Sequence, residues 1–541
     1  MAQAQSAGPV QAGSVSQEQI ESRSPANGRL LGTVLATAPE CVAAEVAAAR
    51  EVQPLWALLR ISDRARYVRA MAQAIIDELD EIVETLCAEQ GRPAAEVAAL
   101  EALAAVDALI WIADSGARAL TGRRVPVHRS IAPAKRARVE QEPFGVIAVI
   151  GAGSAPLAQP LGQIAGALLA GNGVIFKPAR RACMTAQRIA AIVRRAGLPE
   201  GLVRVLHGDA DVGVALTQAP VDKVLFTGSP ATGRMLAREC VARETEVTLE
   251  LGGKDAMLVL ADADVDRAVA GALWAGTAGA GQARGCVERI YVARELQARF
   301  LDRLVAGAGA MRVGDPANPR TQVGPLASQR RLQRVQELVD GALAEGARML
   351  CGGPLPQMPP GCNGAFYSPT VLVDVTPQMQ LMQTAIDGPA IAVTSVESVH
   401  EAIALANMGD PGLGASVWSA DKHGALRIAR ELRAGMVWLN DHLPSPMVTG
   451  GPWGAAAGGG LGRTLGQAGL RACAQEKLIT WDPPRLRGLW WGPYGSSLER
   501  AAKTAVRLRS ARESDRSMAW RGGAIALARA GARTFVKRRG A

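Results

Sequence analysis

The sequence predicts an α/β fold in which helices cover mostly parallel sheets, and three observations carry this prediction. From Gly145 onward, short apolar segments rich in β-branched residues alternate with segments of helical composition. The apolar segments are bounded by glycine or proline, as buried parallel strands are. The chain has 541 residues, 48% of them hydrophobic, which is enough for two or three domains with substantial cores.

The first α/β unit is read from these alternating segments. Strands are expected at GVIAVI (145–150), GVIF (173–176), VRVL (203–206) and KVLF (223–226), and helices at 186–195 and 229–240. Strands joined by helices of this length indicate a parallel sheet of the dinucleotide-binding type, covered on both faces. A second α/β unit is expected from Gly253 to about Pro446.

The N-terminal region is expected to be disordered at first and then helical. Residues 1–24 are polar and rich in Ser, Gln and Gly, which predicts disorder. The following segment predicts a hairpin with a turn at Asn27-Gly28. One helix is expected from near Ser62 to Gly91, and another over about 95–117. The buried face of the first helix is predicted to hold Val68, Met71, Ile75, Leu79, Ile82 and Leu86.

Composition favours a cytoplasmic protein. No run approaches the ~18 consecutive apolar residues of a membrane span, and the N-terminus lacks the basic and apolar regions of a secretory signal. The eight cysteines are scattered without a C-x-x-C pair, and the five histidines have no ligand-like spacing, so neither disulfides nor a metal site are expected.

The net charge of +10 is a property of the C-terminal tail. Residues 485–541 hold 14 Lys/Arg and 3 Asp/Glu, an excess of +11, which leaves −1 for the rest of the chain. A basic segment preceded by Trp490-Trp491 could lie peripherally on an anionic membrane surface. It could instead pack its tryptophan pair on the body and leave the arginine face in water. No specific nucleic-acid partner is expected, because no recognition motif appears.

The stretch from Thr248 to Val292 decides the functional interpretation. It contains ELGGK, then GQ at 281–282, then ERIYV in the same register. This stretch closely resembles the catalytic core of the aldehyde dehydrogenase superfamily, in which the Glu of ELGGK is the general base and the Cys of G-Q-x-C is the nucleophile. Glu250 matches the base. Arg284 stands at the nucleophile position, and the nearest cysteine is Cys286.

The resemblance covers roughly residues 25–482 and implies the domain organisation and the assembly. A homodimer or homotetramer is implied. The expected parts are a disordered N-terminus (1–24), a Rossmann-type cofactor-binding domain (25–120 and 146–249), an α/β catalytic domain (250–467), a small oligomerisation hairpin (121–145 and 468–482) and a basic C-terminal tail (483–541).

The loop FTGSPATG is the predicted nucleotide site. Phe226 and Thr227 end a strand, and Ser229 suits the N-cap of the next helix, whose free N–H groups and dipole favour a pyrophosphate. Gly228 and Gly233 allow the backbone to approach a ligand closely. The alternative is an ordinary strand-to-helix turn.

Two further residues bear on the choice of NAD(P). The resemblance implies that Lys177 reaches the adenosine ribose. Arg180 stands where NAD-using members often have a Glu, and an arginine there would suit a 2′-phosphate, which slightly favours NADP over NAD. Arg180 could equally be a solvated surface residue.

The family's reactive groups are replaced at several positions. Ser154 stands where the family has an asparagine amide that holds the oxyanion, and losing such a donor costs about 3 kcal/mol of transition-state stabilisation. Ala385 and Asp387 replace a Glu and a Phe at the nicotinamide, so a weak grip on that end is expected.

Cys286 and Arg284 allow more than one interpretation. In an extended loop, two residues displace a side chain by about 6.5 Å, whereas reacting atoms must lie about 3 to 3.5 Å apart. Cys286 therefore misses the substrate unless the loop around Gly285 is rebuilt, and it could simply be a small buried hydrophobe. Arg284 stays protonated and is no nucleophile. It could pair with Glu250, bind an anionic ligand such as a carboxylate, or point into solvent.

The resemblance therefore implies a protein that oxidises a small-molecule aldehyde to a carboxylic acid with NAD(P)+, impaired because Arg284 replaces the nucleophile. The alternative is an inactive homologue that acts as a nucleotide- or anion-binding subunit or partner protein. The departures at Ser154, Arg284, Ala385 and Asp387 favour an impaired site over an active site that uses Cys286.

Overall fold

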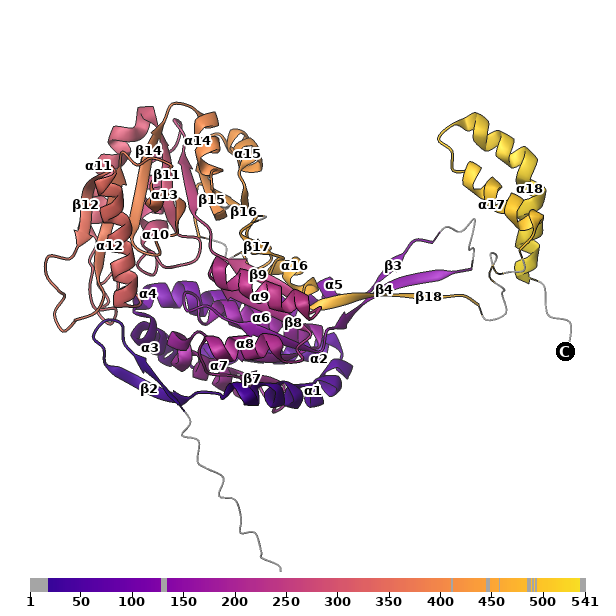
Figure 1. Cartoon of the computed structure of the whole chain (residues 1–541), viewed down its shortest axis with the longest axis horizontal. Helices are drawn as coiled ribbons and strands as arrows, with labels where there is room; N and C mark the ends of the chain where they lie inside the picture. The colour runs from indigo at the N-terminus through magenta and orange to yellow at the C-terminus, as the bar shows by residue number, and fades with distance from the viewer. Residues whose placement is uncertain are drawn as a thin grey trace, which may run out of the picture. The chain divides into compact units, whose positions relative to one another are not determined.

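A computed structural model describes residues 18–127, 134–409, 412–443, 448–456, 458–483, 488, 491 and 494–535. The chain divides into two compact units. The first comprises residues 1–119 and 143–474 and holds two large sheets, and the second comprises residues 120–142 and 475–541 (Figure 1).

The first large sheet has six strands in the order β17-β9-β8-β5-β6-β7. Its strands are β5 (Val146–Ile150), β6 (Gly173–Lys177), β7 (Val203–Val205), β8 (Lys223–Gly228), β9 (Glu246–Leu251) and β17 (Gly460–Leu461). The pairs are parallel except that β17 runs antiparallel to β9. The helices around it are α1 (Val42–Leu58), α6 (Ala158–Ala170), α7 (Cys183–Arg195), α8 (Ala210–Gln218) and α9 (Pro230–Ala242). The strands and helices predicted between 145 and 240 are confirmed.

The uniform hydrophobicity of β5 follows from cover on both faces. Val146 and Ala148 share one hydrophobic cluster with residues of α1, α8 and α9. Ile147 and Val149 point to the opposite face and are also fully buried, since α6 packs on β5 and β6 there.

The second large sheet has seven strands in the order β12-β13-β14-β11-β10-β15-β16. Its strands are β10 (Asp255–Val259), β11 (Val287–Ala293), β12 (Arg348–Pro354), β13 (Tyr367–Val373), β14 (Ala390–Val396), β15 (Gly412–Trp418) and β16 (Ala434–Leu439). β12 is antiparallel to β13, and the other pairs are parallel. Its helices are α10 (Val265–Thr277), α11 (Gln297–Ala310), α12 (Gln329–Ala344), α13 (Gln380–Gln383), α14 (Val399–Ala406) and α15 (Lys422–Glu431). The predicted α/β fold class is confirmed; Pro446, the expected end of this part, lies outside the described residues.

The N-terminal hairpin begins earlier than predicted. β1 (Gln19–Arg23) pairs antiparallel with β2 (Leu30–Leu35), and Gly28 takes a φ of 71° in the turn. The turn at Asn27-Gly28 is confirmed. The disorder predicted up to residue 24 is wrong for β1, because Ile20 is buried against Val34 and Cys183; residues 1–17 lie outside the described part.

The long helix predicted from Ser62 to Gly91 is two helices. α2 (Ile61–Asp77) and α3 (Leu79–Gln90) are separated at Glu78, whose φ of −111° is not helical. Leu79 is exposed, contrary to the prediction, whereas the other residues predicted for the buried face are buried. Gly91 ends α3 in a left-handed conformation.

The remaining short elements complete the first unit. The helix expected over 95–117 is α4 (Ala94–Val97), a π-helical segment (Ala98–Leu103) and α5 (Ala104–Leu120), which run on from one another. The others are α16 (Gly466–Arg471) and three 3-10 turns (Pro39–Cys41, Arg180–Ala182, Arg294–Leu296).

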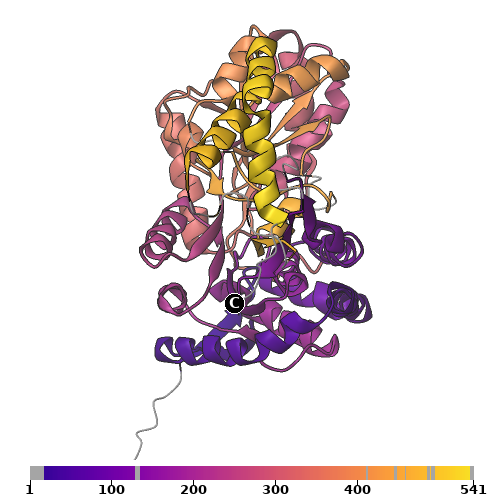
Figure 2. The same ribbon diagram turned by 90° about the vertical axis from the view of Figure 1, so that its right-hand side faces the viewer.

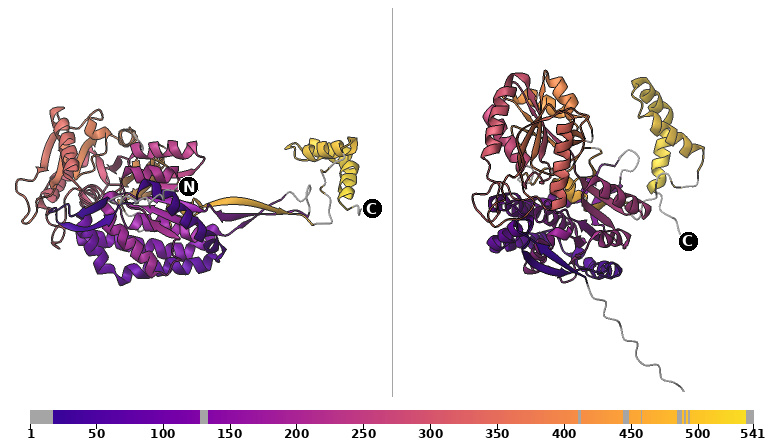
Figure 3. Two further views of the ribbon diagram at one scale, coloured as in Figure 1. Left: turned by 60° about the horizontal axis from the view of Figure 1, so that its bottom comes forward. Right: turned by 60° about the vertical axis from the view of Figure 1, so that its left-hand side comes forward.

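The second unit holds a three-stranded sheet and a helical hairpin. The strands are β3 (Arg123–Val125), β4 (Arg136–Pro143) and β18 (Ala474–Trp481), in the order β18-β4-β3. The helices α17 (Ser496–Arg507) and α18 (Glu513–Phe535) lie side by side around a small cluster that includes Leu498 and Ala501 (Figures 2 and 3). Within this unit Trp491 is exposed, and Trp490 lies outside the described residues. Within the described chain, no helix is long and apolar enough to cross a membrane.

Candidate functional site

A cavity of about 1270 Å³ lies in the first unit. Its wall includes the N-terminal end of α9, the loop at Ser154, part of the loop from Ala278 to Cys286, and the turn that contains Ala385 and Asp387. The structure therefore brings together several of the positions singled out in the sequence, of which the outermost, Ser154 and Asp387, lie more than 200 residues apart.

Glu250 lies beside this cavity but is not part of its wall. Its carboxylate, only 1% exposed, accepts hydrogen bonds from the side chains of Gln159 and Thr464. Thr464 reaches it because β17 pairs with β9 at Glu250. Burial raises the pKa of Glu250, and the charge of Arg284 opposes that shift. Both carboxylate oxygens are therefore engaged by uncharged donors.

Arg284 lines the cavity and does not point freely into solvent. Its Nη2 donates a hydrogen bond to the backbone oxygen of Glu250 at 2.9 Å, and its Nε is buried without a hydrogen-bond partner in the described structure. The side chain forms no ion pair with a described carboxylate. Burial lowers the pKa of Arg284, and the charges of Glu250, Asp387 and Asp255 oppose that shift.

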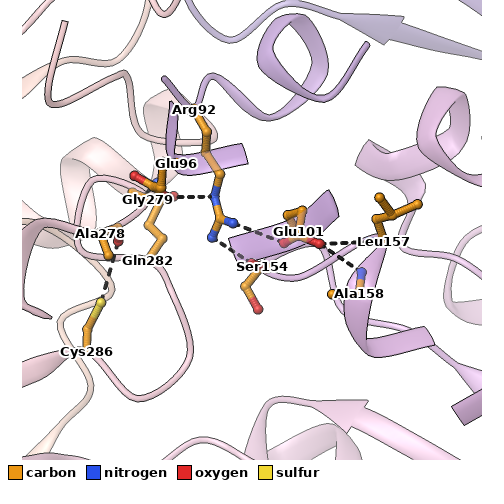
Figure 4. A network of polar contacts seen from close by, with 10 residues as sticks. All are labelled: Arg92, Glu96, Glu101, Ser154, Leu157, Ala158, Ala278, Gly279, Gln282 and Cys286. Atoms are coloured by element: carbon orange, nitrogen blue, oxygen red, sulfur yellow. Dashed lines mark hydrogen bonds and ion pairs between the residues drawn. The ribbon is translucent and has the colours of Figure 1, made fainter. Parts of the chain in front are cut away.

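Cys286 is a buried thiol at the edge of the cavity. The residue is 7% exposed, and its Sγ donates to the backbone oxygen of Ala278 at 3.5 Å (Figure 4). It belongs to a hydrophobic cluster that includes Leu100 and Leu443. Burial raises the pKa of Cys286 well above its ordinary value. At neutral pH the thiol is therefore protonated and poorly nucleophilic.

The loop that carries both residues is tightly turned, so the extended geometry assumed from the sequence is wrong. The N–H groups of Gly281 and Ala283 both bond to the oxygen of Ala278, and the N–H of Cys286 bonds to the oxygen of Ala283. Ala280 and Gly285 have φ of 57° and 84°. The distance estimated for an extended loop does not apply to this conformation.

Ser154 is positioned by a buried charge network that the sequence did not reveal. Arg92 donates to the Ser154 backbone oxygen at 2.7 Å and pairs with Glu101 at 3.1 Å and Glu96 at 3.4 Å (Figure 4). Glu101 also accepts the N–H groups of Leu157 and Ala158. Burial raises the pKa of Glu96 and Glu101, while Arg92 opposes it. The sequence feature that could have indicated this network is the presence of three charged residues, Arg92, Glu96 and Glu101, in an otherwise apolar segment.

The predicted nucleotide residues divide into two groups. Arg180, Gly228 and Ser229 line the cavity. Ser229 caps α9 by accepting the N–H of Thr232 at 3.3 Å, as predicted. The others lie beneath that surface; they are Lys177, Phe226, Thr227 and Gly233.

The contacts of the second group constrain the roles expected of its residues. The ammonium group of Lys177 donates to the backbone oxygens of Pro178 and Gly208, and burial lowers its pKa. Thr227 accepts a hydrogen bond from Gln159 at 2.6 Å. A Cβ at Gly233 would lie 2.3 Å from a methyl group of Leu251, so a larger residue there would require the Leu251 side chain on β9 to move.

The turn with Ala385 and Asp387 is held by charged residues around the seven-stranded sheet. Glu288 accepts the N–H of Ile386 at 3.0 Å and pairs with Lys254 at 2.5 Å. Asp387 forms an ion pair with Arg331. The side chain at 387 is thereby occupied by a neighbouring arginine.

Asp255 is a further residue that the sequence did not single out. It lines the cavity and accepts the N–H of Gly414 at 2.8 Å. Burial raises the pKa of Asp255 to about 7. The sequence did not indicate Asp255, because the preceding ELGGK motif carries no information about whether the next side chain is buried.

Two α/β halves around one cavity, with a capped helix N-terminus in its wall, define a two-domain Rossmann-like α/β class of protein. The sequence profile of the aldehyde dehydrogenase family matches residues 12–479, and the chain belongs to that family. It is 34% identical over 461 residues to a betaine aldehyde dehydrogenase of Rhizobium leguminosarum bv. trifolii, covering 85% of this chain and 93% of that protein.

Solved structures agree with this membership. An Escherichia coli NADP-dependent enzyme superposes with a TM-score of 0.82 at 32% identity, covering 86% of this chain and 95% of that one. A Mycobacterium tuberculosis aldehyde dehydrogenase complexed with NAD+ superposes with a TM-score of 0.81 at 32% identity, with the same coverage of 86% and 95%.

Proposed function

We propose that this protein is an aldehyde dehydrogenase homologue that keeps a nucleotide site but has lost efficient oxidation of an aldehyde to a carboxylic acid. The carrying observation is that the cavity-lining side chain bonded to Glu250 is Arg284, whereas the thiol of Cys286, also in the cavity wall, is bonded to the backbone oxygen of Ala278. A neutral, buried thiol does not attack a carbonyl carbon.

NAD(P) fits the wall of the cavity at one end. Ser229 and Gly228 would hold the pyrophosphate at the N-terminus of α9, and the bound nucleotide would supply a hydride acceptor. The other end fits less well, because Ala385 offers no hydrogen bond and Asp387 is paired with Arg331. Arg180 is held by Glu18 and Asp209, so a 2′-phosphate must compete with two carboxylates. This weakens the preference for NADP.

An anion-binding role at Arg284 is the second candidate. The unpartnered Nε of Arg284 supports it, since a buried donor without an acceptor is costly. The carboxylates of Glu250, Asp387 and Asp255 oppose it, because they already supply negative charge around the guanidinium. We therefore place nucleotide binding first.

Finer aspects of the proposal concern assembly and location. We propose a cytoplasmic homodimer or homotetramer that assembles through the ribbon β3-β4-β18, whose strand β18 is almost wholly exposed in the single chain. The basic hairpin α17–α18 contacts an anionic membrane surface peripherally, which the exposed Met518, Trp520 and Ile525 support.

The test combines turnover with nucleotide binding. Aliphatic, aromatic and acidic semialdehydes are offered with NAD+ or NADP+, and the absorbance of the reduced nucleotide is followed. We expect no turnover above background and a rise in melting temperature with nucleotide. Turnover that disappears in Cys286→Ala would overturn the proposal.

A matched pair of variants makes the binding measurement specific. Ser229→Asp keeps a good helix cap but sets a negative charge against the pyrophosphate, so the nucleotide-induced rise should vanish. Ser398→Asp makes the same change at the cap of α14 and should keep the rise. Loss of the rise in both variants, or in neither, contradicts the proposed site.

A further inference from the structure

His442 lies outside every motif used so far, yet its ring contacts the loop of Arg284 directly. The residue follows β16 and is 1% exposed. Its Nε2 lies 2.8 Å from the backbone oxygen of Gly285, and its Nδ1 lies 2.8 Å from Oγ of Ser416. The ring also meets Trp438 edge-on, with centroids 4.6 Å apart.

The chemistry of the partners fixes where the protons lie. A carbonyl oxygen only accepts, so Nε2 of His442 must carry the hydrogen that bonds to Gly285. In the neutral ring, Nδ1 is then an acceptor and takes the hydroxyl hydrogen of Ser416. Burial lowers the pKa of His442 to about 4, which agrees with a neutral ring at pH 7.

The chain of donors extends one step further back. Nε1 of Trp418 donates to Oγ of Ser416 at 3.0 Å. Trp418 and Ser416 both lie on β15, which is paired on both sides in the seven-stranded sheet. Hydrogen bonds therefore run in one direction from a rigid strand, through the imidazole, to the carbonyl between Arg284 and Cys286.

The carbonyl of Gly285 belongs to a residue whose backbone conformation favours glycine. Gly285 has a φ of 84°, a conformation that favours glycine, and a Cβ there would lie 3.1 Å from Leu443. Rotating the peptide would move both neighbouring side chains, because they share its backbone. The bond to His442 holds the peptide in the orientation that turns Arg284 to Glu250 and Cys286 to Ala278.

We propose that His442 is a positioning residue that locks the Arg284–Cys286 loop to β15 through Ser416. This goes beyond the proposed function and holds whether or not the chain oxidises aldehydes. The neutral Nε2–H form of the ring anchors the loop, and removing that donor frees the peptide of Gly285.

The rate of thiol modification tests this in the full-length protein. Native protein is treated with a small disulfide reagent, and labelling of each cysteine is followed by peptide mass spectrometry. In His442→Leu, labelling of Cys286 should accelerate about tenfold, the effect of losing one buried hydrogen bond. The buried Cys240 belongs to a separate cluster and should keep its rate. His442→Gln, whose amide can donate to Gly285, should restore slow labelling.

The controls separate positioning from general destabilisation. His207 is a second buried histidine, bonded to Gln187, and His207→Leu should leave the Cys286 rate unchanged. Parallel acceleration of Cys286 and Cys240, or no acceleration in His442→Leu, overturns the proposal. Nitrogen-15 histidine spectra compared with those of His442→Gln should assign an Nε2–H tautomer to His442, and an Nδ1–H tautomer would also overturn it.

Discussion

Arg284 and Ser154 occupy the two positions where relatives of this chain are expected to present a thiolate and an amide. Replacing Arg284 by Cys places a thiol at this position, and the family resemblance implies that the shorter Ser154 still leaves an oxyanion without one donor. We expect Arg284→Cys to reduce NAD(P)+ slowly with an aldehyde. Adding Ser154→Asn should raise kcat by roughly a hundredfold, since one such donor is worth about 3 kcal/mol.

Cys286 provides the control for this restoration. Cys286→Ala in the double variant should leave its rate unchanged, because that thiol bonds to Ala278. A double variant that loses its activity with Cys286→Ala would show that the thiol at 286 carries the chemistry.

Asp255 gives the protein a pH-dependent stability of its own. Its folded-state pKa of about 7 lies above its ordinary value, so the folded form takes up the proton more readily than the unfolded chain. The contribution of Asp255 to the stability of the folded protein is complete below about pH 4, and it decreases as the pH rises to 7. Urea unfolding should show that the free energy of unfolding falls between pH 5 and pH 8. This fall should be larger for the wild type than for Asp255→Asn, by up to about 3 kcal/mol. Equal losses would contradict the enclosed carboxyl.

The linker after α3 carries Arg92, whose charge pairs with two buried carboxylates, those of Glu96 and Glu101. Arg92→Met leaves Glu96 and Glu101 buried without their cation, which should cost about 3 to 5 kcal/mol in the free energy of unfolding. Arg92→Lys should cost less, because it keeps the charge. Arg60→Met removes an exposed pair with Asp63, which solvent screens, and should cost far less than Arg92→Met. If Arg92→Met unfolds like Arg60→Met in urea titrations, the network is not structural.

The hairpin α17–α18 carries the prediction about membranes. Its outer surface combines exposed Trp520 and Ile525 with Arg521 and Arg529, while its own core is small. Full-length protein should sediment with phosphatidylglycerol vesicles at low salt and be released at high salt. It should not sediment with phosphatidylcholine alone.

Charge reversals distinguish the tail from the body. Arg521→Glu with Arg529→Glu should abolish sedimentation, whereas Arg60→Glu with Arg66→Glu, also exposed but at the start of α2, should not. If the wild-type protein is absent from the vesicle pellet at every salt concentration, the proposed membrane contact is wrong.

Across the whole molecule, the sequence predicts the positions of strands more successfully than the contacts between side chains that are distant in the chain. The strands β5, β6 and β8 were predictable because each is a short apolar run closed by glycine or proline. α1 was not predicted, since Pro54 inside it argues against a helix, and nothing local marks the break at Glu78. The partners of Glu250 lie 91 and 214 residues away, at Gln159 and Thr464, and no local pattern encodes them.

Assembly is the prediction that belongs to the complete molecule. Leu478 and Trp481 of β18 are exposed in the single chain, as expected of a strand that meets another copy. Leu478→Asp with Trp481→Asp should convert the oligomer to a monomer in sedimentation velocity. Leu58→Asp, an exposed leucine at the end of α1, should leave the assembly intact. A wild type that sediments as a monomer contradicts the proposed ribbon interface.

The guanidinium of Arg284 also changes how this protein withstands an oxidising environment. Enzymes that depend on a reactive thiolate lose activity when peroxide converts its sulfur to an acid. Here the cavity-lining side chain bonded to Glu250 contains no sulfur, and the thiol of Cys286 is protonated and buried. Ligand binding in this cavity should therefore survive peroxide concentrations that inactivate an enzyme with a reactive thiolate.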